Sequence, residues 1–152
     1  WQGSHSMKLK SVQKSVLLWY SAQEMYDLVI DVPKYPEFLP WCDHAQVVEH
    51  TPDGMVARIG MQVAGLSKSF TTRNVHTPGR QVALSLVDGP FKALQGTWDF
   101  IPMGEERACK VVLNLNYSFD SVLGSLVAPV FDRIASTLVD AFVERAQTVY
   151  PA

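Results

Sequence analysis

Apolar and polar residues alternate through most of the middle of this chain. The pattern is clearest in the segment 109–119, where apolar side chains share one parity and Lys110, Asn114 and Asn116 hold the other. A period of two residues is typical of strands that have one buried face and one wet face, which favours antiparallel pairing. Turn signals such as Pro52-Asp53-Gly54 separate the segments. We therefore expect an antiparallel sheet with strands over 12–20, around 47–48, and over 55–63, 67–75, 82–87, 94–100 and 109–119. The segment 67–75 is the weakest of these, because it is more polar and is marked mainly by Phe70.

Two helical regions flank these strands. Ser21 with Glu24 three residues later has the spacing of a capping box, and the helix that follows stops before Pro33. From Leu123 to Tyr150, apolar residues recur at spacings of three and four, which predicts a long amphipathic helix with a kink at Pro129 or a start close to it. The predicted fold class is α+β: a curved antiparallel sheet wrapped around a long C-terminal helix, with two short N-terminal helices.

The segment Val32–Cys42 combines three prolines with Tyr35, Phe38, Leu39 and Trp41. Proline removes amide donors and restricts the preceding residue, so a long helix is excluded here. The segment carries too much apolar area for a solvated loop. It is interpreted either as a structural plug over the end of the sheet or as the rim of a pocket.

Several motifs carry a resemblance to a known family. They are Met25–Val29, Tyr35–Cys42, Phe70–Arg73, Gly89–Leu94 with Trp98-Asp99-Phe100, and Ala141–Ala146 near Tyr150. Together they resemble the coenzyme Q-binding proteins of the START-like superfamily, also called SRPBCC or polyketide cyclase-like. That group includes ribosome association toxins of the RatA type and proteins once labelled oligoketide cyclases. The resemblance covers nearly all of residues 7–150 and implies a helix-grip, Bet v 1-like fold.

The resemblance also implies a function. It favours non-enzymatic binding of ubiquinone or a related polyprenyl lipid in a tunnel between sheet and C-terminal helix, in support of respiratory electron transport. The alternative is a RatA-type toxin that binds the large ribosomal subunit and blocks subunit association, and polyketide cyclisation is the least favoured. A solid core and a lipid pocket have the same sequence pattern. Composition alone favours the solid core, whereas the resemblance favours the pocket. We expect a tunnel of a few hundred cubic ångströms, with no cofactor required.

The predicted ligand-binding residues are the apolar inward positions of strands and helix, together with a hydrophobic gate at the proline-bounded turns. The gate comprises Phe38, Leu39, Trp41, Pro90 and Phe91, which we expect to flank one open end and to touch a membrane interface. The remaining lining residues are Met61, Val63, Phe70, Leu84, Leu94, Trp98, Leu113, Tyr117, Val127, Phe131, Ile134, Leu138 and Phe142.

No catalytic or metal-binding constellation is apparent. The sequence has no nucleophile elbow, no paired metal ligands and no phosphate-binding glycine loop. His44, His50 and His76 are expected at the surface near turns or strand ends, and Cys42 has no catalytic signature around it. We therefore expect a protein that is not an enzyme.

Chain length and net charge limit the number of domains and the kinds of partner. The 152 residues fit one START-like lipid-binding domain over 7–152, with residues 1–6 expected to be a tag remnant ahead of Met7. The net charge of -2 and pI near 6.1 argue against DNA as a partner and mildly against RNA. Cys42 and Cys109 are expected to be reduced and buried. Because no long apolar run occurs, we expect a cytoplasmic protein, peripheral at most at the inner membrane.

Overall fold

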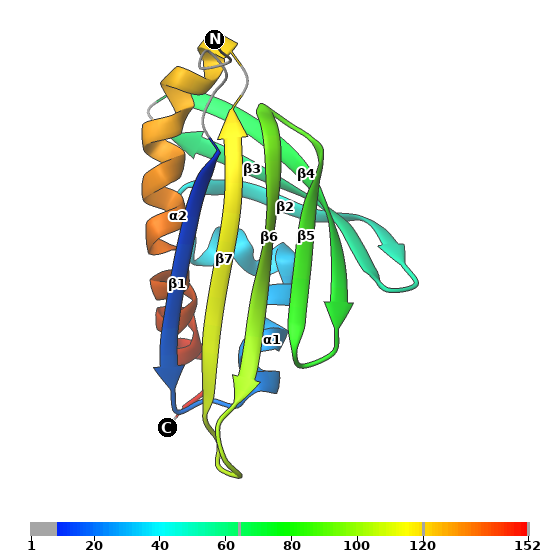
Figure 1. Ribbon diagram of the computed structural model, residues 1–152, viewed down its shortest axis with the longest axis vertical. Coiled ribbons are helices and arrows are strands. Elements are labelled where there is room, and N and C mark those ends of the chain that lie inside the picture. The colour runs from blue at the N-terminus through cyan, green and yellow to red at the C-terminus, as the bar shows by residue number, and fades with distance from the viewer. Residues whose placement is uncertain (1–8, 64, 120, 152) are drawn as a thin grey trace, which may run out of the picture.

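The computed structural model describes residues 9–63, 65–119 and 121–151 (Figure 1), so the expected tag remnant lies outside the described residues. Its strands are β1 (Lys10–Leu18), β2 (Cys42–Thr51), β3 (Gly54–Val63), β4 (Leu66–Thr77), β5 (Gln81–Asp88), β6 (Phe91–Pro102) and β7 (Cys109–Phe119). Its helices are α1 (Ala22–Ile30), the 3-10 helix η1 (Val32–Glu37) and α2 (Ser121–Val149).

The strands form one seven-stranded antiparallel sheet in the order β1-β7-β6-β5-β4-β3-β2. From β2 to β7 each strand pairs with the next one in the sequence, whereas β1 pairs with β7. All the predicted strands are present, and β4 runs the full length from Leu66 to Thr77 despite its polar character. The predicted α+β fold, a curved antiparallel sheet with a long C-terminal helix, is confirmed.

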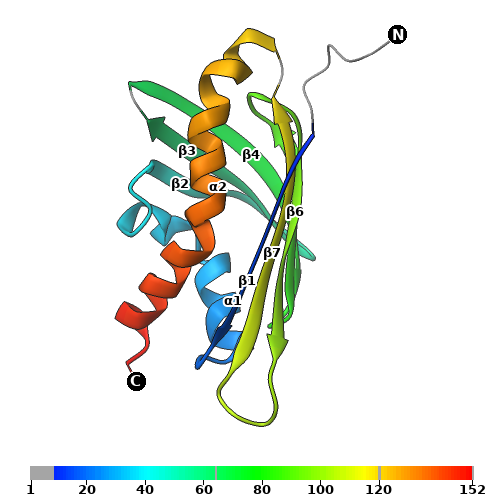
Figure 2. The ribbon, with the colours of Figure 1, turned by 60° about the vertical axis from the view of Figure 1, so that its left-hand side comes forward.

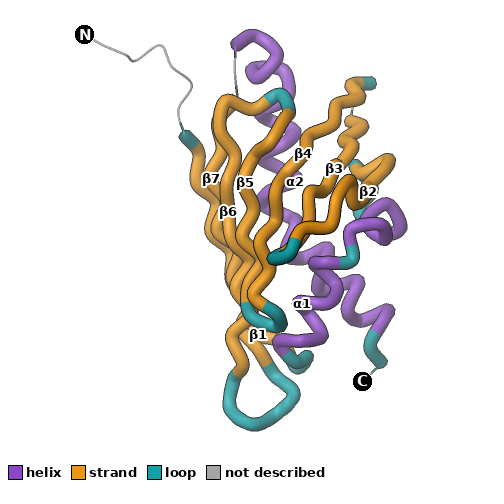
Figure 3. Tube along the Cα trace, turned by 90° about the vertical axis from the view of Figure 1, so that its right-hand side faces the viewer, coloured by secondary structure: helices purple, strands orange, loops and turns teal. Residues whose placement is uncertain are grey.

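The helix α2 covers one face of the sheet, as Figures 2 and 3 show. Its predicted apolar stripe faces inward: Phe131, Ile134 and Phe142 are buried and Leu138 is partly buried. Ala135 is completely buried, so the helix backbone approaches the sheet closely at this point. The helix begins before Pro129 and continues through it.

The two short N-terminal helices were also predicted correctly. Ser21 caps α1: its hydroxyl accepts a hydrogen bond from the Glu24 amide, and the Glu24 carboxylate accepts one from the Ser21 amide. This reciprocal pair satisfies two amide groups that a helix start leaves without partners. The helix ends at Ile30, and the proline-rich segment forms η1 rather than a loop.

Aromatic side chains build two separate parts of the core. In one part, Phe91 packs against Phe119 and Phe131, with ring centroids 4.8 and 5.0 Å apart. In the other part, Phe142 packs edge-on against Phe38 at 5.1 Å and against Trp98 at 5.2 Å. Residues from both parts line an interior cavity.

Candidate hydrophobic ligand site

An interior cavity of about 100 Å³ lies between the inward face of the sheet and α2. Its lining comes from η1, the segment that follows it, five strands and the helix, and is almost entirely apolar. The lining residues are Val32, Tyr35, Leu39, Trp41, Ala57, Ile59, Phe70, Thr72, Asn74, Leu84, Leu94, Trp98, Leu115, Phe131, Ile134, Ala135, Leu138 and Phe142.

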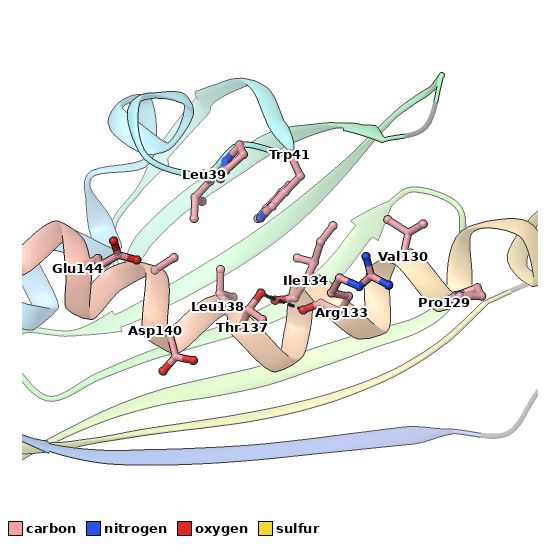
Figure 4. Close-up of a pocket in the computed structure, with 12 residues that line it drawn as sticks. Leu39, Trp41, Pro129, Val130, Arg133, Ile134, Thr137, Leu138, Asp140 and Glu144 are labelled. Atoms are coloured by element: carbon pink, nitrogen blue, oxygen red, sulfur yellow. Dashed lines mark hydrogen bonds between the residues drawn. The ribbon is translucent and has the colours of Figure 1, made fainter.

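A larger groove of about 470 Å³ runs along the outer side of α2, facing the segment after η1 (Figure 4). Its floor is apolar, and charged side chains stand among its lining. The lining residues are Leu39, Pro40, Trp41, Pro129, Val130, Arg133, Ile134, Thr137, Leu138, Asp140, Ala141 and Glu144.

Four side chains line both spaces and therefore separate them. They are Leu39 and Trp41 from the segment after η1, and Ile134 and Leu138 from α2. Figure 4 shows the first two pointing toward the helix and the second two pointing back toward them. We call these four residues the wall, since one layer of side chains is all that lies between groove and cavity.

The backbone around the wall is firmly held. The Leu39 amide donates to the Tyr35 carbonyl at 2.9 Å, and the Gln62 amide of β3 donates to the Trp41 carbonyl at 2.8 Å. Arg145 of α2 also bonds Glu37 at 2.9 Å. These contacts hold the main chain beside Leu39 and Trp41 in place.

The interior cavity is smaller than the few hundred cubic ångströms expected from the sequence. An apolar cavity of roughly 150 Å³ can hold benzene, and ligand sites usually span about 300–1,000 Å³. The cavity alone is too small for such a ligand. The groove, at about 470 Å³, falls within the usual range by itself, so a ligand of ordinary size can lie in the groove but must displace the wall to enter the interior.

Many of the predicted lining residues lie around the cavity. Those that do are Leu39, Trp41, Phe70, Leu84, Leu94, Trp98, Phe131, Ile134, Leu138 and Phe142. They come from three clusters of the hydrophobic core, which meet around the cavity.

The gate expected from Phe38, Pro90 and Phe91 is not assembled in the structure. Phe38 packs against Phe142, whereas Phe91 packs against Phe131. Eleven residues separate these two helix positions, or about 16 Å along the axis. Two aromatic side chains so far apart cannot close one opening, so the residues at the boundary are instead Leu39 and Trp41 with their partners on α2.

Four more of the predicted lining residues lie away from the cavity. Leu113 is fully buried in the core, and Tyr117 donates a hydrogen bond to Asp132 of α2. Met61 and Val127 line a separate space of only about 20 Å³. Val63 lies in β3, but its side chain falls outside what the structure describes.

Sequence reasoning missed eight residues of the lining. Six are apolar or aromatic and belong to η1, inner strands or the helix: Val32, Tyr35, Ala57, Ile59, Leu115 and Ala135. The other two, Thr72 and Asn74, are polar and have the same strand parity as Phe70. Their signal was present in the sequence as the polar character of the segment 67–75.

The polar groups in and near the site are poorly suited to acid–base chemistry. The Tyr35 hydroxyl donates to the Val29 carbonyl, and burial holds the pKa of Tyr35 far above its usual value. Burial also raises the pKa of the Cys42 thiol to about 11, so this thiol is protonated at neutral pH. Cys42 and Cys109 are both free and buried, as expected.

The histidines lie differently from one another. His44 and His50 are exposed, as predicted, whereas His76 is half-buried and its Nε2 atom is buried without a hydrogen-bond partner in the described structure. Burial lowers the pKa of His76, which keeps the ring neutral at pH 7. Among residues 9–63, 65–119 and 121–151 there is no cluster of three or more His, Cys, Asp or Glu side chains placed to hold a metal ion.

The sequence comparisons identify the family. The family model "Polyketide cyclase / dehydrase and lipid transport" matches residues 18–143. The chain belongs to this family. The resemblance inferred from the sequence motifs is thereby confirmed.

Similar proteins within the family carry different functional names. The chain is 47% identical over 143 residues to the ribosome association toxin RatA of Vibrio cholerae, covering 93% of this chain and 99% of that protein. It is 29% identical over 141 residues to a mitochondrial coenzyme Q-binding protein homologue of Xenopus laevis, covering 90% of this chain and 58% of that protein. These similarities support a ligand-binding or RatA-type role.

A solved structure confirms the fold at lower identity. The Zhui aromatase/cyclase of Streptomyces sp. R1128 matches with a TM-score of 0.80 and 18% identity, over 92% of this chain and 94% of that one. At this identity the match establishes the shared fold and leaves the chemistry open. In the part of the chain that the structure describes, no helix is long and apolar enough to cross a membrane.

Proposed function

We propose that this protein binds a hydrophobic ligand without changing it chemically, and that the ligand is ubiquinone or a related polyprenyl lipid. The ligand occupies the interior cavity and the outer groove once the wall has opened. Residues 7–152 act as one ligand-binding domain, which shelters the quinone at the periphery of the inner membrane and supports respiratory electron transport.

The observation that carries this proposal is the wall between two apolar spaces. Protein interiors are normally packed to the density of organic crystals, with few voids larger than a water molecule. Here an interior cavity lies one side chain away from a groove of about 470 Å³. Apolar enclosure of a ligand contributes roughly 25 cal/mol per Å² of buried apolar surface and requires no titrating group.

The polar lining supports binding rather than catalysis. Thr72 and Asn74 do not titrate near neutral pH, and the Tyr35 hydroxyl is engaged with the Val29 carbonyl. A general acid or base would need a pKa near the working pH and a position within reach of the ligand. The lining of the interior cavity offers no such pair, so polyketide cyclisation remains the least favoured function.

The proposal is tested by purifying the native protein without detergent, extracting it with organic solvent and analysing the extract by mass spectrometry. A polyprenyl quinone or similar lipid at a constant ratio to protein is the expected result. An extract without lipid, together with no binding in a titration with a short-chain ubiquinone, would exclude lipid carriage.

A second candidate function is RatA-type association with the large ribosomal subunit. It is favoured by the identity of 47% to the Vibrio cholerae toxin over almost the whole of both chains. The test is sedimentation of ribosomes in a sucrose gradient with and without the protein. Separation into subunits, with the protein in the large-subunit fraction, would support this function; unchanged ribosomes would exclude it.

A further inference from the structure

One strand of the sheet carries polar side chains on its inward face. At alternate positions of β4 stand Thr72, Asn74 and His76. Asn74 pairs with Met55 of β3 on one side and with Leu84 of β5 on the other. An amide placed between two apolar neighbours at the cavity costs free energy unless it gains a hydrogen-bond partner.

The amide of Asn74 is already held on one side. The Thr72 hydroxyl, whose residue is only 5% exposed, donates a hydrogen bond of 2.8 Å to Oδ1 of Asn74. This bond orients the amide and uses one of the two lone pairs of its acceptor oxygen. The Nδ2 donor makes no hydrogen bond to another described residue. Asn74 is half-buried and lines the cavity, and its Nδ2 is not among the fully buried atoms without a partner, so this donor is accessible to a ligand.

The other polar atoms of the lining are less suited to holding a ligand. The Tyr35 hydroxyl already donates its hydrogen bond to the Val29 carbonyl. The indole nitrogens of Trp41 and Trp98 are donors as well, but both rings contribute mainly apolar surface to the site. Asn74 therefore offers the donor that packing alone does not explain.

We propose that Asn74 is the polar anchor of this site, and that its amide N–H donates a hydrogen bond to a carbonyl or ether oxygen of an otherwise apolar ligand. Thr72 is a positioning residue that orients this amide. The inference rests on the proposed function and deepens it, because it specifies the chemical class of the buried end of the ligand.

The anchor selects among hydrophobic molecules. A hydrocarbon leaves the amide without a partner when it displaces water from the cavity, which costs affinity. A carboxylate at the same place is also disfavoured, because no cationic side chain lines the interior cavity. The preferred ligand is thus neutral and carries an oxygen acceptor at its buried end.

The experiment compares two probes of nearly the same shape, menadione with its carbonyl groups and methylnaphthalene without them. Their affinities are measured by isothermal titration calorimetry for the wild-type protein and for Asn74→Leu, which keeps the side-chain size and removes the donor. The wild type should prefer menadione. Asn74→Leu should weaken menadione binding about two- to twelve-fold, the range expected for one neutral hydrogen bond, and leave methylnaphthalene within about twofold.

Three further variants isolate the anchor. Leu84→Met alters the apolar neighbour of Asn74 and should shift both probes equally. Thr72→Val removes the positioning hydroxyl and should reduce the preference for menadione while retaining the Asn74 donor. Trp98→Phe removes the competing indole donor and should preserve the preference. Asn74→Leu should melt at a lower temperature than the wild type, because it leaves the buried Thr72 hydroxyl without its acceptor.

The possible results separate the anchor from the proposed function. If the wild type binds both probes equally, or if Asn74→Leu weakens both equally, the anchor is wrong while hydrophobic binding stands. If Trp98→Phe alone abolishes the preference, the donor has been assigned to the wrong residue. If the wild type binds neither probe, the proposed function fails along with the anchor. If Asn74→Leu fails to fold, Asn74→Asp takes its place in the titrations, since it keeps the shape and replaces the donor with a carboxylate that repels the carbonyl oxygen. Loss of the preference for menadione in this variant would support the anchor, and an unchanged preference would contradict it.

Discussion

Trp41 is the residue whose replacement best separates a wall from an ordinary core position. It is only half-buried and lines both groove and cavity. Trp41→Ala should weaken binding of a short-chain ubiquinone by about tenfold or more, through loss of apolar contact, while costing less than the roughly 3–5 kcal/mol typical of a core aromatic. Quinone titration and chemical denaturation of the same variant measure the two effects.

Phe100→Ala provides the matched control for this prediction. Phe100 is 1% exposed, stacks on Trp98 and does not line the cavity, so its removal should cost the full core penalty. A Trp41→Ala protein that is equally destabilised, and whose folded fraction binds quinone normally, would show that Trp41 is structural.

Three histidines and Cys42 should be dispensable for binding. His44→Gln, His50→Gln, His76→Gln and Cys42→Ser should each bind quinone within about twofold of the wild type, because apolar enclosure needs no proton transfer. None of the four lines the cavity. Loss of function by several orders of magnitude in one of them, with the melting temperature preserved, would instead indicate a general base.

Residue roles were only partly predictable from the sequence. The inward parity of Leu84, Leu94 and Trp98 follows from alternation, and the structure places all three at the cavity. Phe38 and Phe91 could not be located in this way, because their neighbours depend on how the proline-bounded turns pack against α2. An inward polar residue such as Asn74 interrupts the alternation of apolar and polar residues by which a strand is predicted. The polar residues that made β4 the weakest strand prediction therefore also mark the site.

At the scale of elements, α1 is tied to the β6–β7 hairpin by one ion pair. Arg107 makes two hydrogen bonds of 2.7 Å to the Glu24 carboxylate, and these lower the pKa of Glu24 from 4.5 to about 2. A carboxylate whose folded pKa is depressed contributes stability that is present above its unfolded pKa and lost as the pH falls through the folded value. The loss should therefore occur as the pH falls from about 4.5 toward 2.

Arg107→Gln tests this link. The variant should be less stable than the wild type at pH 6, and the gap between them should narrow at pH 3, as measured by urea denaturation. The effect should be modest because the Arg107 side chain is 44% exposed. Ser21→Ala is the comparison: it removes the helix cap and leaves the ion pair, and since the Ser21 hydroxyl contributes less than Arg107 to the lowered pKa of Glu24, its stability gap should change less with pH. A gap that does not change with pH would contradict the assignment.

The elements themselves were largely predictable, and their arrangement less so. Period-two alternation identified the strands, and the Ser21–Glu24 spacing identified the start of α1. The pairing of β1 with β7 depends on a contact between the two ends of the sheet sequence, which no local pattern encodes. The 3-10 form of η1 likewise depends on packing around Tyr35, Phe38 and Phe142.

At the scale of the whole molecule, the volume of the interior was the feature that sequence could not supply. Apolar stripes on sheet and helix are identical for a solid core and for a ligand tunnel. The difference arises from side-chain sizes at a few facing positions, such as Ala57 and Ala135, whose small side chains line the cavity. The existence of an inner face was thus predictable, whereas its free volume was not.

Ala135→Leu fills free volume in the interior and so tests whether the ligand binds there. Ala135 is fully buried and lines the cavity, and leucine adds three carbon atoms there. The variant should lose quinone binding by occupying the ligand's place, with a stability change within the roughly 1–3 kcal/mol typical of overpacking. Wild-type protein should gain about 2.7 kcal/mol of stability at a quinone concentration one hundred times its dissociation constant, whereas the variant should gain none. Thermal melts with increasing quinone measure both.

The same variant decides between the two candidate functions. If lipid binding is the basis of any effect on ribosomes, Ala135→Leu should lose the shift in sucrose-gradient sedimentation together with quinone binding. If ribosome association depends on the outer surface of the fold, the variant should keep it while failing to bind quinone. Leu84→Met, which changes the lining without filling the cavity, controls for indirect disturbance of the fold. Full retention of quinone binding by Ala135→Leu would place the ligand outside the interior, because a cavity of about 100 Å³ cannot hold both.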